Sequence, residues 1–192
     1  MVDGLNNILI TGGARSGKSH FAQELARKSG KPVLFVATAE AGDEEMRQRI
    51  EEHKKARPAD WTTLEVTMNV GSEIRRNIGS TQVVIIDCIT LLINNIISKY
   101  NDHDHEPVNI PLIEEKVTGE IGELIDCMKQ VNARFIIVTN EVGTGLVPAT
   151  RIGRLYRDLL GKANQSLAQH VNEVYLMVAG LPVKIKSDAA IS

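Results

Sequence analysis

The 192-residue sequence predicts an α/β fold with a mainly parallel sheet flanked by helices. Two observations carry this prediction. Short β-branched runs recur along the chain and are apolar at consecutive positions, which is typical of strands covered on both faces. The stretches between these runs are long enough to hold helices. Since one domain usually spans ~100–200 residues, we expect a single domain over residues 1–192.

The expected strands begin with residues 7–11, which precede a glycine pair, and the later ones follow polar or glycine-containing breaks. In chain order they are 7–11, 33–38, 83–87, 135–140, 173–179 and 183–186, with a weaker strand at 62–67. The first expected helix ends at Gly30 and Pro32, and the second ends before Pro58. In chain order the helices are 18–29, 43–57, 90–100, 112–131 and 149–171.

Residues 101–111 are expected to form a surface loop, because they combine two prolines with histidines and acidic residues. His103 and His105 leave metal binding open as the alternative, although no second cluster completes a site. Residues 187–192 are expected to form a frayed tail.

Charge and composition narrow the classes of function. The chain has 22 Lys and Arg against 24 Asp and Glu, so a broadly basic nucleic-acid-binding face is excluded. No apolar run approaches the ~18 residues of a membrane span, and a small-molecule partner is expected. The polar N-terminus resembles neither a signal nor a transit peptide, which predicts a cytoplasmic protein. Cys88 and Cys127 lie in apolar stretches and are expected to be reduced core residues.

A phosphate-binding loop is the most specific feature of the sequence. Residues 12–19 read Gly-Gly-Ala-Arg-Ser-Gly-Lys-Ser and fit GxxxxGK[ST] between an expected strand and an expected helix. Glycines let backbone N–H groups turn toward phosphate oxygens at the helix N-terminus, where the helix dipole favours negative charge. Lys18 is expected to reach the β- and γ-phosphates, and Ser19 is expected to bind Mg²⁺.

Asp87 follows the buried run 83–86, at the strand end where phosphate-loop enzymes place a carboxylate near the metal. Contact with the metal or the nucleotide is expected, and a cap for the following helix is the alternative. Residues 139–143 also lie at the end of a buried strand, where ligands bind in open α/β sheets. Arg151, Arg154 and Arg157 on the helix beyond fit an anion or subunit contact as well as a solvated face.

His53 continues the apolar face of the helix expected over residues 43–57. Arg49 and Arg57 lie one turn before and after it, so they disfavour the imidazolium and attract phosphate oxygens. A neutral imidazole in that setting is suited to attack phosphorus. A plain kinase does not need such a nucleophile, so His53 indicates a second reaction, and a half-buried structural histidine is the alternative.

Together these residues resemble the bifunctional adenosylcobinamide kinase/adenosylcobinamide-phosphate guanylyltransferase family of cobalamin biosynthesis. The resemblance covers nearly the whole chain, through residues 10–19, 37–38, 49–61, 87–90, 139–148, 157–165 and 179–182. It implies a RecA-like P-loop NTPase fold, a homotrimer with sites between subunits, and His53 as the guanylylated residue. It implies that the nucleotide-binding residues are Gly12, Gly13, Ala14, Arg15, Ser16, Gly17, Lys18, Ser19, Ala37, Thr38, Ala39, Lys54, Lys55, Ala56, Arg57, Glu65 and Asp87.

These observations predict an enzyme with two reactions, in which Lys18 and His53 are catalytic and Ser19 and Asp87 hold Mg²⁺. A nucleoside triphosphate would phosphorylate adenosylcobinamide, and GTP would then guanylylate the product through His53, with ATP and GTP as the substrates. One alternative is a P-loop small-molecule kinase without nucleotidyl transfer. Another is a nucleotide-operated switch, although the chain lacks the guanine-reading motif Asn-Lys-x-Asp.

Overall fold

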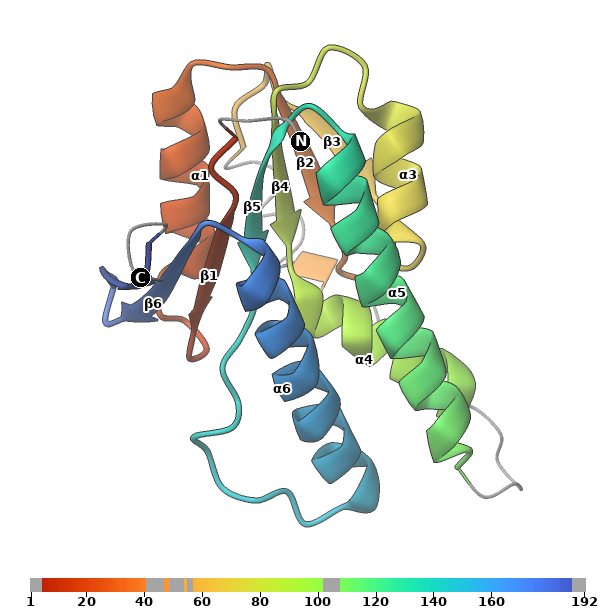
Figure 1. The fold of residues 1–192 in the computed structure, drawn as a ribbon. Coiled ribbons are helices and arrows are strands. Elements are labelled where there is room, and N and C mark those ends of the chain that lie inside the picture. Colours follow the sequence, from red (N-terminus) through yellow and green to blue (C-terminus); the bar gives the residue numbers. More distant parts are fainter. Residues whose placement is uncertain (1–4, 41–46, 49–53, 55–56, 102–107, 188–192) are drawn as a thin grey trace.

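The computed structural model of the chain describes residues 5–40, 47–48, 54, 57–101 and 108–187 (Figure 1). Its strands are β1 (Ile8–Gly12), β2 (Val33–Ala37), β3 (Thr62–Glu65), β4 (Val83–Asp87), β5 (Arg134–Val138), β6 (Glu173–Val178) and β7 (Leu181–Lys186). Its helices are α1 (Lys18–Ser29), α3 (Val70–Asn77), α4 (Ile89–Asn101), α5 (Ile110–Gln130) and α6 (Arg151–His170). No helix among the described residues has both the length and the apolar character that crossing a bilayer requires.

The described strands form one sheet in the order β3-β2-β4-β5-β1-β6-β7. All neighbouring strands are parallel except β7, which pairs antiparallel with β6. The predicted α/β class with a mainly parallel sheet is therefore confirmed. Strand β5 separates β1 from β4, so the chain segments that follow these three strands lie side by side at one edge of the sheet.

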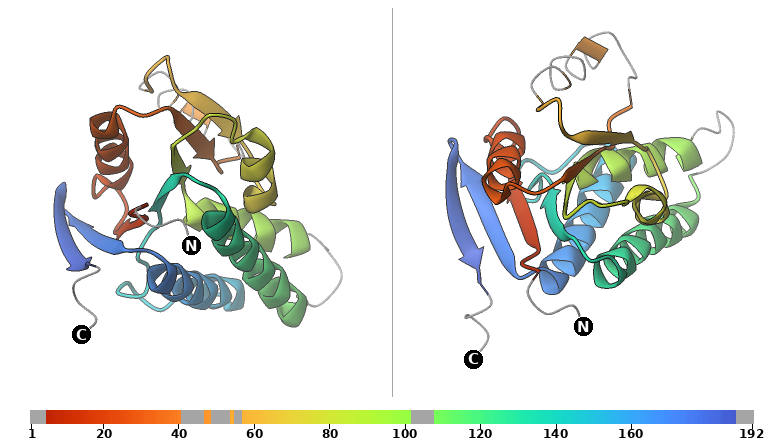
Figure 2. Two further views of the ribbon diagram at one scale, coloured as in Figure 1. Left: turned by 45° about the horizontal axis from the view of Figure 1, so that its top comes forward. Right: turned by 90° about the horizontal axis from the view of Figure 1, so that it is seen from above.

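Helices cover both faces of the sheet (Figures 1 and 2). Because side chains alternate along a strand, Ile8 and Ile10 of β1 pack with Ala22 of α1, whereas Leu9 packs into the larger cluster on the other face. Residues of α3, α4, α5 and α6 pack in that larger cluster with Leu9 and other strand residues. This two-sided burial is the physical reason for the continuous apolar runs in the strands.

The predicted elements that lie wholly on described residues agree with the structure in type, and the bounds of α1 and β4 agree residue for residue. Helix α3 was not predicted. The predicted loop 101–111 is wrong at its end, because α5 begins at Ile110 with Pro111 in its first turn. Asn109 caps this helix by accepting a hydrogen bond from the Leu112 amide at 3.1 Å. Residues 102–107, which include His103 and His105, lie outside the described residues, as does most of the predicted helix 43–57.

Helix α3 is held by a carboxylate from another helix. Glu120 of α5 is buried, and its two carboxylate oxygens accept hydrogen bonds from the amides of Asn69 (2.9 Å) and Val70 (2.7 Å). These amides lie at the N-terminus of α3, where N–H groups have no partner within the helix and favour negative charge. The stability of α3 thus depends on Glu120, which lies 50 positions from Val70 in the sequence. The local sequence of the helix cannot reveal this contact.

The β6–β7 hairpin contains a carboxylate that should make stability depend on pH. Burial by itself raises the pKa of Glu173, but hydrogen bonds from Lys184, Tyr175 and Asn6 outweigh it and hold that pKa at about 2, against an ordinary 4.5. A lowered pKa stabilises the folded state above the unfolded value, and this contribution is lost as the pH falls from about 4.5 through about 2.

We therefore expect Glu173→Gln to lower the free energy of unfolding by about 1 kcal/mol at pH 7, because its partner Lys184 is substantially exposed. The difference from the wild type should shrink as the pH falls below about 4.5. Urea unfolding at several pH values measures it, with Glu115→Gln in an exposed ion pair as the control. A difference that stays constant down to low pH would contradict the assignment.

Candidate active site

The phosphate loop joins β1 to α1, and two of its glycines are required by geometry. Gly12 has φ +143°, and a Cβ at this position would lie 2.5 Å from the carbonyl oxygen of Met177. Gly17 has φ +93° and forms the N-cap of α1. Side chains are strained at both positions, so the loop can turn its backbone toward a ligand only with glycine there.

Lys18 is the first residue of α1 and folds back over the loop. Its side chain is buried, and Nζ donates to the Gly13 carbonyl oxygen at 2.5 Å and to Ser16 Oγ at 3.4 Å. Burial lowers the pKa of Lys18, and the negative charge of Asp87 acts in the opposite direction. An ammonium group held in this way is desolvated and ready to bind an anion.

A cavity of about 800 Å³ opens beside this loop. It is lined by most of the predicted nucleotide-binding residues, namely Ala14, Arg15, Ser16, Gly17, Lys18, Ser19, Ala37, Ala39, Lys54, Arg57, Glu65 and Asp87. Gly12, Gly13 and Thr38 do not line it. His53, Lys55 and Ala56 lie outside the described residues. The structure thus brings together residues from five separate parts of the sequence.

Thr38 does not line the cavity but supports the residues that do. Its buried hydroxyl donates to the Cys88 carbonyl oxygen at 2.7 Å and accepts from the Cys88 amide at 2.8 Å. These two bonds join the end of β2 to the residue that follows Asp87. Thr38 therefore fixes the position of the Asp87 backbone instead of facing the cavity.

Cations and carboxylates from outside the loop also line the cavity. Lys54 pairs with Glu65 at 2.7 Å, and the Arg57 guanidinium carbon lies 3.9 Å from the ring centroid of Phe35. Burial lowers the pKa of Arg57, while Asp87 and Glu65 act in the opposite direction. Within the described residues, the buried Nε and Nη1 of Arg57 have no hydrogen-bond partner. Such donors are suited to bind a ligand oxygen.

Ser19 and Asp87 line the same cavity from α1 and β4. A hydroxyl and a carboxylate are the oxygen ligands that Mg²⁺ prefers, and Mg²⁺ usually completes its shell with phosphate oxygens and water. The described part of the chain contains no group of three or more His, Cys, Asp and Glu side chains suited to a metal. The donor set fits a metal held jointly with a nucleotide instead of by a protein cage.

The cavity also has lining residues that sequence analysis did not select, namely His20, Phe35, Arg47, Cys88, Thr90, Leu91 and Val138. Asn140, from the strand-end segment 139–143 that was expected near a ligand, lines the cavity as well. Cys88 and Thr90 also follow a buried strand, and that position was the available signal. Phe35 lies inside β2, where an apolar run gives no sign of contact with a ligand. Cys88 was expected in the core but is half-buried, and burial raises its pKa to about 11, so it stays a thiol.

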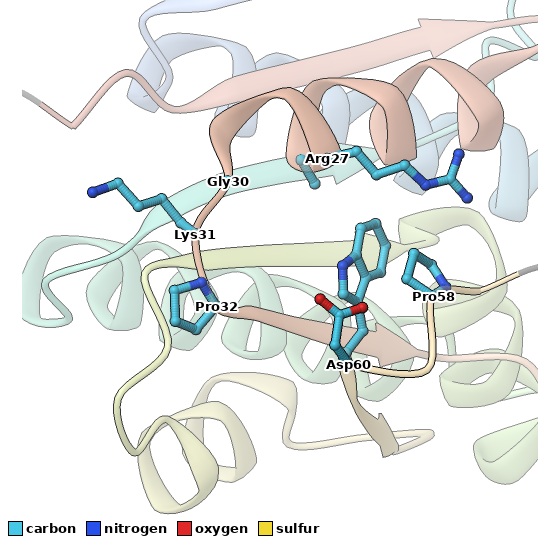
Figure 3. A pocket seen from close by; sticks show the side chains of 8 residues that line it. Arg27, Gly30, Lys31, Pro32, Pro58 and Asp60 are labelled. Carbon is cyan, nitrogen blue, oxygen red and sulfur yellow. The ribbon is translucent and has the colours of Figure 1, made fainter.

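A second cavity of about 540 Å³ lies beside the C-terminus of α1 (Figure 3). Arg27, Lys31, Asp60 and Trp61 are among the residues that line it. None of the predicted site residues does so. Arg151, Arg154 and Arg157 line neither cavity, and Arg154 hydrogen-bonds to the carbonyl oxygens of Pro148 and Ala149. Because the phosphate loop lines only the larger of these two cavities, we take that cavity as the candidate active site.

Comparison with solved structures supports the fold. The chain superposes on a structure from Pyrococcus horikoshii with a TM-score of 0.54 at 9% identity, covering 95% of this chain and 86% of that chain. It superposes on an ATPase of the type III secretion system of pathogenic bacteria with a TM-score of 0.54 at 11% identity, covering 93% and 56%. At this identity the similarity shows the fold alone. The phosphate loop at residues 12–19, between β1 and α1, identifies this fold as that of a P-loop NTPase.

Sequence comparison is more specific. The chain is 41% identical over 180 residues to the "Bifunctional adenosylcobalamin biosynthesis protein CobU" of Escherichia coli, covering 93% of this chain and 99% of that protein. It is 39% identical to the protein of the same name from Salmonella typhimurium, with the same coverage. It is 38% identical to the corresponding CobP of Pseudomonas aeruginosa, covering 94% and 97%.

The family model described as "Cobinamide kinase / cobinamide phosphate guanyltransferase" matches residues 8–185. This range begins at the first strand, contains the phosphate loop and every described residue of the cavity, and ends within the last strand. The chain therefore belongs to the cobinamide kinase / cobinamide phosphate guanyltransferase family.

Proposed function

We propose that residues 1–192 act as one catalytic domain that phosphorylates adenosylcobinamide and then transfers GMP from GTP to the product, giving adenosylcobinamide-GDP and pyrophosphate. The family match and the names of the relatives support this proposal. The observation that carries it is the buried Lys18 ammonium on a phosphate loop that faces the cavity. The cytoplasmic location predicted from the sequence stays a prediction.

In the kinase reaction, the loop amides and Lys18 would bind the triphosphate. The bond between the γ-phosphorus and the β,γ-bridging oxygen breaks while the acceptor hydroxyl oxygen bonds to the γ-phosphorus and loses its proton to water. Lys18 would stabilise the negative charge that develops on the departing phosphate. Ser19 and Asp87 would hold Mg²⁺, which neutralises charge on the phosphate oxygens.

In the second reaction we propose that a ring nitrogen of His53 attacks the α-phosphorus of GTP and that pyrophosphate leaves. A phosphate oxygen of adenosylcobinamide phosphate then displaces the histidine and forms the new P–O–P bond. Sequence neighbours support this role, because Lys54 and Arg57 line the cavity and supply cations suited to phosphate oxygens.

Incubation with α-labelled GTP tests the proposal. A phosphoramidate is acid-labile, so we expect label on the protein that acid removes and that adenosylcobinamide phosphate collects. A kinase without nucleotidyl transfer would phosphorylate adenosylcobinamide and leave the protein unlabelled. A nucleotide-operated switch would do neither.

We further propose that the chain assembles as a homotrimer, as the family resemblance implies. The β6–β7 edge of the sheet supports an interface, because Val178, Leu181, Val183 and Ile185 are large apolar side chains exposed to solvent there. Sedimentation at micromolar concentration should give about three times the 21.1 kDa of one chain. A mass near that of one chain would contradict the trimer.

A further inference from the structure

Asn140 follows the central strand β5, at the end of the sheet where the phosphate loop follows β1. Beyond the end of β5 the chain continues alongside β1, since the Thr139 amide donates to the Ile10 carbonyl oxygen at 3.0 Å and the Glu141 amide donates to that of Gly12 at 3.0 Å. Asn140, between these two residues, lines the candidate active site together with Lys18 and Asp87. The strand order thus places it between the loop and the carboxylate.

The backbone of Asn140 is fixed by side chains from two helices. Its amide donates to the buried Thr90 hydroxyl of α4 at 2.7 Å, and its carbonyl oxygen accepts from Asn164 Nδ2 of α6 at 3.0 Å. Asn164 is oriented in turn, because its Oδ1 accepts from the fully buried Thr139 hydroxyl at 2.7 Å. Three polar side chains therefore define where Asn140 sits.

The carboxamide of Asn140 is the one part of this arrangement that stays available. No residue that the structure describes forms a hydrogen bond with that side chain, which is half-buried at the cavity wall. Water could satisfy the backbone groups of a partly exposed strand end, so these groups do not need the side-chain bonds from Thr90 and Asn164. Because the bonds hold the backbone in place beneath an available amide, the arrangement is typical of a preorganised binding site.

We propose that Asn140 contacts the substrate in the phosphoryl-transfer reaction, with Nδ2 donating a hydrogen bond to an oxygen of the transferring γ-phosphoryl group. Thr90 and Asn164 are its positioning residues. This inference rests on the proposed kinase activity. The amide neither gains nor loses a proton, and it stabilises charge on the oxygens while the bond to the bridging oxygen breaks and the bond to the acceptor hydroxyl forms.

The test compares Asn140→Ala with Asn94→Ala, an exposed asparagine on α4 away from the cavity. We expect Asn140→Ala to lower kcat for phosphoryl transfer about 100-fold, the effect of losing one preorganised donor. The Kd for GTP and the amount of acid-labile label from α-labelled GTP should stay within about threefold, because the amide acts at the γ-phosphoryl group and not at the α-phosphorus. Asn94→Ala should match the wild type.

Asn164→Ala tests the positioning role. It should lower kcat about 10-fold with KM for the triphosphate unchanged, since a tilted Asn140 loses transition-state contact but not ground-state binding. A purely structural residue would instead lower the melting temperature and the label capacity together. Should Asn140→Ala fold poorly, Asn140→Ser, which keeps a polar group but falls short of the phosphoryl oxygen, is expected to show the same loss of kcat.

Two results would overturn the inference. One is phosphoryl transfer by Asn140→Ala within about threefold of wild type, and the other is an equal loss of both activities and of GTP binding. Failure of the proposed function looks different, because the wild-type protein itself would then transfer no phosphoryl group to adenosylcobinamide.

Discussion

Lys18→Ala is expected to lower the rate of adenosylcobinamide phosphorylation by about 100-fold or more, a loss on the order of 3 kcal/mol of transition-state stabilisation. The buried ammonium group folds back over the loop, where its Nζ donates to the Gly13 carbonyl oxygen. Steady-state kinetics with saturating triphosphate measures the effect. A near wild-type rate would contradict the assignment of the loop.

The control for this variant is Lys28→Ala, at the exposed C-terminal end of the same helix. It should leave the kinase rate unchanged. Stability offers a second check: burial lowers the pKa of Lys18, so the ammonium is held at a desolvation cost when no phosphate is bound. Lys18→Ala should therefore melt no lower than the wild type without nucleotide, and it should lose the stabilisation that GTP gives the wild type.

Much of the fold could be predicted because its signals are local. Strand β4 is a run of Val and Ile covered on both faces, and α1 is bounded by Gly17 and Gly30 with left-handed backbone. Helix α3 escaped prediction because it has eight residues and its N-terminus is capped by Glu120 of another helix. The start of α5 was missed because the capping Asn109 was attributed to the adjacent loop.

In the site too, residues with a local signal could be predicted, whereas residues placed by contacts between distant segments could not. The phosphate loop is a contiguous motif, and Asp87 ends a buried strand, so both could be located by spacing. Thr38 does not face the cavity, because its hydroxyl is used to hold Cys88. Phe35 beneath Arg57 could not be predicted, since a contact between β2 and a residue before β3 depends on how the sheet is assembled. The strand-end position of Asn140 was a local signal, but its place beside the phosphate loop required the strand order, in which β5 lies between β1 and β4.

His53→Asn is expected to abolish guanylyl transfer while the kinase activity continues. Asparagine keeps a polar side chain but cannot form the phosphoramidate, so label from α-labelled GTP should fall to background. The γ-phosphoryl transfer needs the phosphate loop, the metal and a positioned hydroxyl, and it makes no use of an imidazole nucleophile. Parallel assays of protein labelling and adenosylcobinamide phosphorylation measure the two activities in one variant.

The matched variant is His20→Asn, because His20 of α1 lines the cavity and is the histidine that the described structure offers as a rival nucleophile. The exposed His20 side chain faces Glu24 one turn along the helix, with Nε2 at 3.8 Å from Oε1. Because this contact is with a carboxylate and not with phosphate-binding cations, His20→Asn is expected to keep both activities. Label that persists in His53→Asn and disappears in His20→Asn would move the covalent step to His20. Loss of both activities in a folded His53→Asn protein would mean that His53 also takes part in phosphoryl transfer, so one residue would serve both displacements on the shared phosphate loop.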